Sequence, residues 1–204
     1  MPEPQVVDPT VSRRKFDREV ALHREREAFH RRRGCFLIDA VFPEVFVTCA
    51  SVKVRPAAVV AGVVLDFTDY DLRPPSLTFV DPFTREPLTA KDLGLTMIRR
   101  PPDTDDAALL AMMQAGVPMQ NMIQANGPEA RPFLCLPGIR EYHDNSAHTG
   151  DSWLLHRGSY EGSLAFILEK IWAHGINPIE AFQIMIQAQA PIVMLGLAPA
   201  RVAA

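Results

Sequence analysis

The segment from residue 35 to residue 80 constrains the fold most, because it consists of short strand-like runs in direct succession. The runs CFLIDAVFPEVFVTCASVKV and AAVVAGVVLDFT are rich in β-branched and aromatic residues, which favour a pleated sheet. Pro43 and Arg55–Pro56 interrupt them, and a Pro74–Pro75 loop precedes a further short strand over Leu77–Val80. This order predicts an antiparallel meander of four strands.

Helical patterns lie on both sides of this segment. A proline-rich lead-in, residues 1–11, is followed by a helical pattern from Ser12 to about Arg33, with Gly34 as its predicted end. After the strands, Leu164, Ile167, Leu168 and Ile171 have helical spacing, and Gly175 is the predicted end of that helix. Asn177 and Pro178 indicate the start of another helix, over NPIEAFQIMIQAQAP. Strands in series with helices at the ends predict an α+β fold.

The middle of the chain, from about residue 81 to residue 131, differs from both. It has many prolines, one short helical pattern (DTDDAALLAMMQAG) and a Met/Gln/Asn-rich piece. We interpret it as an insertion in a single domain of residues 1–204. Five methionines fall within it, and they would either fill gaps in the core or form an adaptable contact surface: Met97, Met112, Met113, Met119 and Met122.

Charge and cysteine content exclude several classes of protein. A net charge of −3 gives no general reason to expect nucleic acid as a partner. No run approaches the roughly 18 apolar residues of a membrane span, and the N-terminus does not resemble a signal peptide, so we expect a cytoplasmic protein. Three cysteines fit a reducing compartment, with Cys35 and Cys49 as small buried residues. Nine of the 21 basic residues lie between Arg13 and Arg33, on a helix that either contacts an acidic partner or a phosphate surface or is a solvated face.

The segment CLPGIREYHDNSAHTGDSWLLHR, residues 135–157, gathers a cysteine, a glutamate and three histidines. Thiolate, imidazole and carboxylate groups are zinc ligands, usually four in a tetrahedron. If the backbone is extended, Glu141 and His143 point to the same face, and the Pro137–Gly138 turn folds the segment back toward Cys135. The sequence therefore predicts a metal site, with zinc as the expected ion, made by Cys135, Glu141, His143 and His148.

Three other interpretations of the same residues stay open. Cys135 would be a nucleophile if His143 or His148 lowered the pKa of its thiol or acted as a base. FLCL would be an ordinary buried strand in which Cys135 only packs. Metal-assisted hydrolysis would need Glu141 as a general base beside a Cys/His/His zinc. His156 is a fifth candidate, but SWLLHRG is typical of the approach to a helix, which favours a core or surface histidine. His23, His30 and His174 lie in helical patterns and receive no role.

The element order and the residues VVLDFTDYDLRPPSLTFVDPF resemble the ubiquitin-conjugating enzymes. Tyr70, Pro74, Pro75 and Phe79 match that family's signature, and Cys135 falls in the position of its active cysteine. The histidine–proline–asparagine stretch that usually precedes that cysteine is absent here. The resemblance implies an N-terminal helix, a four-stranded meander, C-terminal helices and, in the active form, a modifier carried as a thioester on Cys135.

CLPGIREYHDNSAHTGDSW also resembles a bacterial family of predicted metal-binding proteins defined by a cysteine, a glutamate and two histidines. The genes of that family lie near genes for ubiquitin-like proteins and their enzymes. Cys135, Glu141, His143 and His148 would fill those positions. The resemblance implies an accessory or adaptor protein whose partners are a ubiquitin-like protein and its activating or conjugating enzyme.

Overall fold

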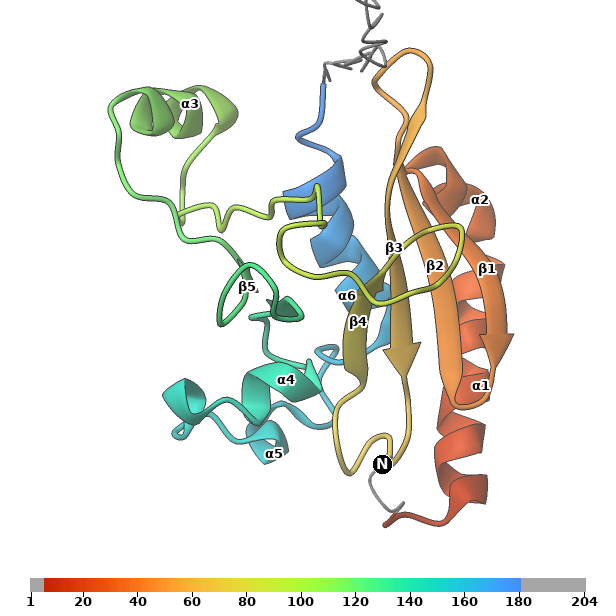
Figure 1. The fold of residues 1–204 in the computed structure, drawn as a ribbon. Coiled ribbons are helices and arrows are strands. Elements are labelled where there is room, and N and C mark those ends of the chain that lie inside the picture. Colours follow the sequence, from red (N-terminus) through yellow and green to blue (C-terminus); the bar gives the residue numbers. More distant parts are fainter. Residues whose placement is uncertain (1–5, 181–204) are drawn as a thin grey trace, which may run out of the picture.

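A computed structural model describes residues 6–180 of the chain. Figure 1 shows a central sheet with helices packed along it and a set of loops and short helices at its other side. The strands are β1 (Cys35–Val41), β2 (Glu44–Ser51), β3 (Ala58–Asp66), β4 (Ser76–Val80), β5 (Ile123–Gln124) and β6 (Phe133–Leu134). The helices are α1 (Pro9–Glu25), α2 (Glu27–Arg32), α3 (Asp106–Gln114), α4 (Arg140–His143), α5 (Trp153–His156) and α6 (Leu164–Ile171). A 3-10 turn, η1 (Ser146–His148), and a π-helical turn, η2 (Trp172–Ile176), complete the set.

The predicted meander is confirmed. The first four strands pair in chain order, β1-β2-β3-β4, and every pair is antiparallel. Val47, Val63 and Phe79 lie opposite one another on adjacent strands and are all buried. Because side chains alternate between the two faces of a sheet, this register places one apolar row toward the core.

The helices differ in detail from the sequence prediction. The single helix expected over residues 12–33 is two helices, because the backbone leaves helical geometry at Arg26. Gly175 does not end α6; it lies inside η2, where an added Cβ would lie 3.0 Å from Met97 Cγ. A glycine therefore allows the π turn to approach the core closely. Residues 181–191 of the further helix expected from Asn177 lie outside the described residues.

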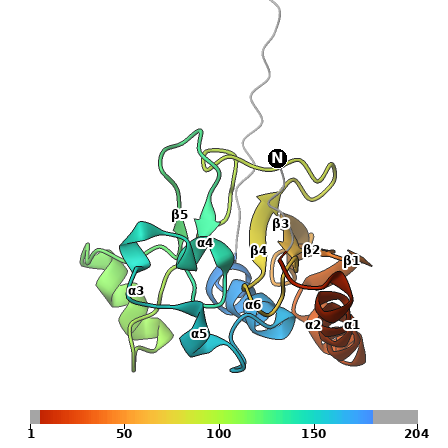
Figure 2. The ribbon, with the colours of Figure 1, turned by 90° about the horizontal axis from the view of Figure 1, so that it is seen from below.

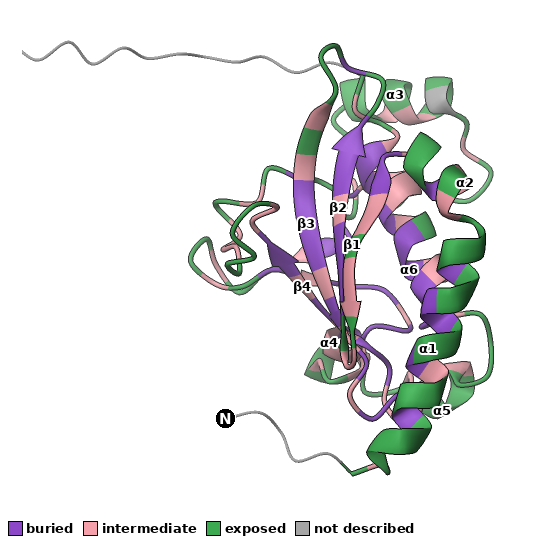
Figure 3. Ribbon diagram, turned by 90° about the vertical axis from the view of Figure 1, so that its right-hand side faces the viewer, coloured by how far each residue is buried: buried purple, intermediate pink, exposed green. Residues whose placement is uncertain are grey.

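One face of the sheet is covered by α1 and α6 (Figure 3). Phe16 and Val20 of α1 pack in the same buried cluster as Ile167 and Ile171 of α6. Burial of each such side chain contributes about 1.5–3 kcal/mol. The two helices are also joined by a polar contact, since the buried Glu19 carboxylate accepts the Leu164 N–H at the start of α6 (3.2 Å). A carboxylate is favourable there because the first turn of a helix has free N–H groups.

Residues 81–131 leave the sheet after β4 and return at β6. They contain α3 and the strand β5, which pairs with β6. Ile98 and Asn121 form a bridge that closes the base of a protruding segment, residues 99–120, called here the α3 lobe. The methionines of this region differ in burial, which fits gap-filling for some of them. Met97 and Met122 are buried in the core, and Met113 on α3 is exposed.

Within residues 6–180, no helix has the length and apolar character needed to cross a membrane.

Candidate functional site

Cys135 follows β6 and is enclosed by the core. Its side chain belongs to the main buried cluster, and the residue is only 1% exposed. Its N–H donates to the Met122 carbonyl (2.7 Å), and its own carbonyl accepts from Arg99 Nη2 (3.2 Å). Burial raises the pKa of the Cys135 thiol, and the nearby Arg99 charge opposes that rise only in part.

An imidazole lies directly against this thiol. Cys135 Sγ and His148 Nε2 are 3.4 Å apart, which places them in hydrogen-bond contact. His148 is held from its other side by Tyr142, whose ring stacks on the imidazole with centroids 4.0 Å apart. Burial, together with a hydrogen bond to Asp151, raises the pKa of Tyr142 to about 12, so its phenol stays a donor. The pair of Cys135 and His148 is therefore fixed by packing as well as by the contact itself.

The segment after Cys135 is docked on the Pro74–Pro75 loop. Arg140 makes three contacts there: its N–H donates to the Pro75 carbonyl (2.9 Å), Nε to Pro74 (3.2 Å) and Nη2 to Thr68 (2.6 Å). Further along, Trp153 Nε1 donates to the Asp71 carbonyl (2.9 Å). The Pro74–Pro75 loop thus holds the cysteine segment in place through hydrogen bonds. Arg140 had no predicted role, and an isolated arginine gives no pattern from which to predict one.

His143 is engaged on both ring nitrogens. The Gly138 N–H donates to Nε2 (3.1 Å), so Nδ1 carries the proton and donates to the Asp151 carbonyl (2.9 Å). The predicted turn at Pro137–Gly138 is present, with Gly138 at a φ of +91°. A Cβ at Gly138 would lie 2.3 Å from the Gly162 nitrogen, so only glycine fits this close approach.

Glu141 points elsewhere. The prediction of extended backbone at this point is wrong, because residues 140–143 form the short helix α4, on which positions two apart do not share a face. The Glu141 carboxylate accepts from Ser76 Oγ and from the Leu77 N–H (3.1 Å) at the start of β4. It also lines an open groove of about 680 Å3 to which neither Cys135 nor the two histidines contribute. In this arrangement Glu141 joins α4 to the sheet.

A second polar group, which the sequence did not assign, lies next to His143. His156 is held between two carboxylates: Nε2 contacts Asp151 Oδ1 (2.5 Å), and Nδ1 contacts Glu161. These contacts raise the pKa of His156, the one with Asp151 most, while the bonds from Tyr142 and His156 lower the pKa of Asp151. The only sequence signal for this group is the i, i+5 spacing on each side of His156, which corresponds to no common motif.

The expected zinc ligands are thus brought together only in part. Two ligands of one tetrahedral zinc lie roughly 3.5 Å apart, and the Cys135–His148 separation of 3.4 Å fits that geometry. Glu141 and His143 each hold other partners instead. Within residues 6–180, no group of three or more His, Cys, Asp or Glu side chains is arranged to hold a metal ion. The four residues do not fit a four-ligand zinc site as they stand.

The fold and this site define an α+β protein with a closed cysteine–histidine pair beside a four-stranded meander. The chain belongs to the Y4jH-like family, whose sequence profile matches residues 7–179. It is 54% identical over 190 residues to the uncharacterized protein y4jH of Sinorhizobium fredii (strain NBRC 101917 / NGR234). That alignment covers 92% of this chain and 93% of the relative. The match spans the sheet, the α3 lobe and the cysteine segment together.

Proposed function

We propose that this chain is an accessory protein of a ubiquitin-like modification pathway, built on a ubiquitin-conjugating-like domain whose cysteine is closed. The observation that carries the proposal is the burial of Cys135 against His148. A cysteine that accepts a modifier must be reached by the C-terminus of another protein, and it must ionise. Cys135 is 1% exposed and burial raises the pKa of its thiol, so the resting protein favours neither condition.

The pathway assignment rests on the arrangement of elements and on the signature residues. α1 precedes the meander, the Pro74–Pro75 loop leads into β4, and the cysteine segment docks on that loop through Arg140. These features support a ubiquitin-conjugating-like domain and, with it, a role in binding a ubiquitin-like protein or one of its enzymes.

We keep zinc in this proposal, but with two protein ligands in place of the four expected. Cys135 and His148 are the residues that would hold the ion, and a structural zinc would supply folding stability at this point. Glu141 would have to leave Ser76 and Leu77, and His143 would have to leave Gly138, before either joined them.

A second candidate function is favoured by the thiol–imidazole contact. An imidazole 3.4 Å from a thiol is within reach of its proton, the arrangement by which histidines activate nucleophilic cysteines. In this alternative the protein is a conjugating enzyme that carries the modifier as a thioester on Cys135. It requires the η1 turn, which contains His148, to move so that the thiol is uncovered.

Alkylation kinetics distinguish a closed cysteine from an active one. Cys35 and Cys49 are buried and free, so they serve as internal controls in the same chain. We expect iodoacetamide to label Cys135 as slowly as these two, measured by peptide mass spectrometry under native conditions. Labelling of Cys135 well ahead of both controls would contradict the accessory proposal and favour the enzyme.

Metal content and binding test the remaining parts. Elemental mass spectrometry of protein purified without chelator gives zinc per chain; Cys135→Ser and His148→Ala should each abolish any zinc bound by the pair, and Glu141→Gln should not. Loss of zinc in Glu141→Gln as well would restore the four-residue site. With the cognate modifier, its activating enzyme and ATP, we expect binding without a reductant-sensitive adduct on Cys135. An adduct lost in Cys135→Ser would establish the enzyme instead.

A further inference from the structure

Helix α3 is apolar on all sides and nevertheless exposed. Asp105 caps its start by accepting the Ala108 N–H (2.7 Å). From residue 107 to residue 113 the sequence is Ala-Ala-Leu-Leu-Ala-Met-Met, without one polar side chain. Leu110 is 56% and Met113 is 51% exposed. Figures 1 and 2 both place α3 at the opposite side of the molecule from α1. A helix without a polar face is normally buried, so this helix requires a cover.

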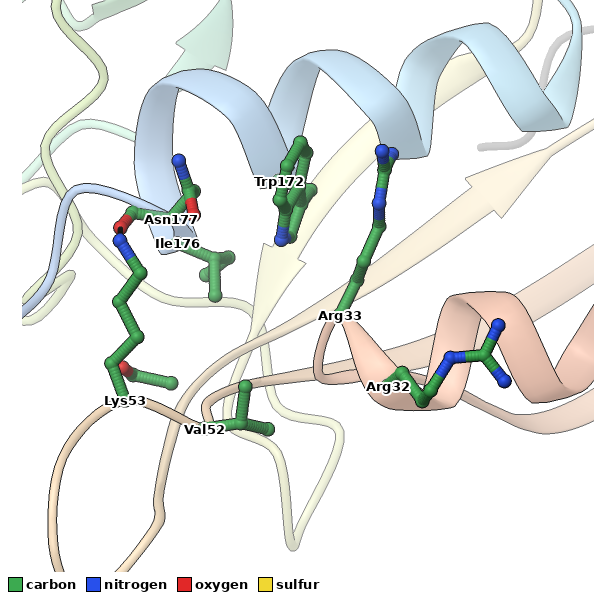
Figure 4. A pocket seen from close by; sticks show the side chains of 8 residues that line it. Arg32, Arg33, Val52, Lys53, Trp172, Ile176 and Asn177 are labelled. Carbon is green, nitrogen blue, oxygen red and sulfur yellow. Dashed lines mark hydrogen bonds between the residues drawn. The ribbon is translucent and has the colours of Figure 1, made fainter.

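The base of the α3 lobe contacts η2, the turn that leads to the end of the described chain. The Ile98 carbonyl lies 3.2 Å from His174 Nδ1, within η2, and Gly175 packs against Leu95 and Met97. The end of the described chain is held nearby at the other side of η2. Figure 4 shows Lys53 reaching Asn177, with Nζ 2.7 Å from its carbonyl, at a small cavity that Trp172 also lines. The described chain therefore ends, at Glu180, close to the attachment of the lobe.

The composition of residues 181–204 matches that of α3. These 24 residues contain a single charged side chain, Arg201. Apolar side chains recur along them: Phe182, Ile184, Met185, Ile186, Ile192, Val193, Met194, Leu195, Leu197 and Val202. A segment of this length spans roughly 36 Å even at the short rise of a helix, so reach does not limit contact with the lobe. Contact between these two apolar segments would remove the apolar surface of both from water.

The size of α3 favours a cover from the same chain over a second copy. Nine helical residues present a face about 14 Å long and about 10 Å wide. Stable interfaces between separate chains bury roughly 800 Å2 on each partner, far more than such a face supplies. A tethered segment needs less contact area, because its effective concentration near the helix is about millimolar.

We propose that residues 181–204 dock on α3 and cover its apolar surface, with Leu110 and Met113 in the contact. The docked segment would join the α3 lobe to the end of the chain and stabilise a helix that has few other contacts. This inference is independent of the function proposed for the Cys135 site.

The first test is site-specific photo-crosslinking in the full chain. A photoreactive residue replaces Leu110 in one variant and Phe83, an equally apolar residue that is 83% exposed on the β4–α3 connection, in the matched control. At low micromolar concentration, we expect the Leu110 variant to crosslink within one chain to a site in residues 181–204, and the Phe83 variant not to do so. Trypsin releases residues 171–201 as one peptide, so the site can be read by fragmentation. A crosslinked dimer, or a Leu110 variant without any crosslink to this segment, would overturn the proposal.

Hydrogen exchange gives a second measurement that does not depend on a crosslinker. The chain is truncated after Glu180, and amide exchange is compared with that of the full chain. We expect the amides of α3 to exchange at least roughly tenfold faster in the truncated chain while those of β2 and β3 keep their protection. Unchanged exchange in α3 would overturn the docking. If the sheet also lost protection, the crosslinking result alone would decide.

Discussion

His23 and His30 lie on α1 and α2, whereas His143, His148 and His156 lie on the short helices and the 3-10 turn after β6. The two groups differ in what their ring nitrogens contact. The first two rings stack with centroids 4.2 Å apart and are buried, and three of their four ring nitrogens have no hydrogen-bond partner. In the second group, every ring has at least one polar contact. We call them the histidine pair and the histidine cluster.

The difference shows what each group of histidines does. In the histidine pair, burial lowers the pKa of His23 to about 4 and also lowers that of His30, so both rings are neutral packing elements at neutral pH. In the histidine cluster, His148 contacts Cys135, while His143 and His156 contact Asp151. The Tyr142 ring, which stacks on His148 and donates to Asp151, joins the two parts. Of these two groups, only the cluster has ring nitrogens in contact with Cys135 or with carboxylates.

Removal of the Tyr142 ring should break the cluster with the largest effect on stability. Tyr142 is buried, stacks on His148 and donates to Asp151 (2.6 Å), so Tyr142→Ala removes one contact from each of them and leaves a cavity. We expect the free energy of unfolding to fall by about 3–5 kcal/mol, measured by urea denaturation. Alkylation of Cys135 should also accelerate, because His148 is then no longer held over the thiol.

Tyr142→Phe is the matched control. It keeps the stacked ring and loses only the hydroxyl, for which we expect about 1 kcal/mol. If both variants lost the same stability, the stack would have no structural role and the cluster would depend on Asp151 alone.

Acid should break the histidine pair first. Between about pH 6.5 and about pH 4 the unfolded chain binds a proton at His23 that the native protein does not bind, so stability falls as the pH falls through this window. A shift of this size corresponds to up to about 3 kcal/mol. His23→Leu removes the proton site and should flatten the profile in urea denaturation at a series of pH values. An equally steep profile in the variant would assign the acid sensitivity to other groups.

Variants of Glu141 test whether its carboxylate anchors α4 to β4 or binds a metal ion. Glu141→Ala leaves the Leu77 N–H without its acceptor and should cost about 1–3 kcal/mol, whereas Glu141→Gln keeps an acceptor oxygen and should cost less. The measurement is thermal unfolding combined with zinc content. Loss of zinc in Glu141→Gln, which keeps an acceptor oxygen for Leu77, would show that Glu141 acts as a ligand.

The sequence predicted the fold better than the site, and the residues explain why. The strands of the meander follow from local β propensity and from Pro43 and Pro56, which act over a few positions. The pairing of Cys135 with His148 depends on α4, a helix of four residues, and on contacts from Arg140 to a loop more than 60 residues earlier. A helix this short has too few residues to show a period, and long-range contacts leave no local pattern. Glu141 and His143 were therefore expected on one face of an extended segment, whereas Glu141 points from α4 to the start of β4.

The smallest expected effect comes from His156, and its contribution to stability changes with pH in the opposite direction to that of His23. Asp151 and Glu161 raise the pKa of His156 above its ordinary value of 6.5, so its contribution to stability is fully present below that value. The contribution is lost as the pH rises through the raised pKa, because the native protein then releases the proton that its two carboxylates had favoured. His156→Gln should therefore lower stability more at about pH 6 than at about pH 9, in urea denaturation against the wild type. A difference that grew toward high pH would mean that His156 is neutral between its partners, and the contrast between the histidine pair and the histidine cluster would then rest on hydrogen bonding without charge.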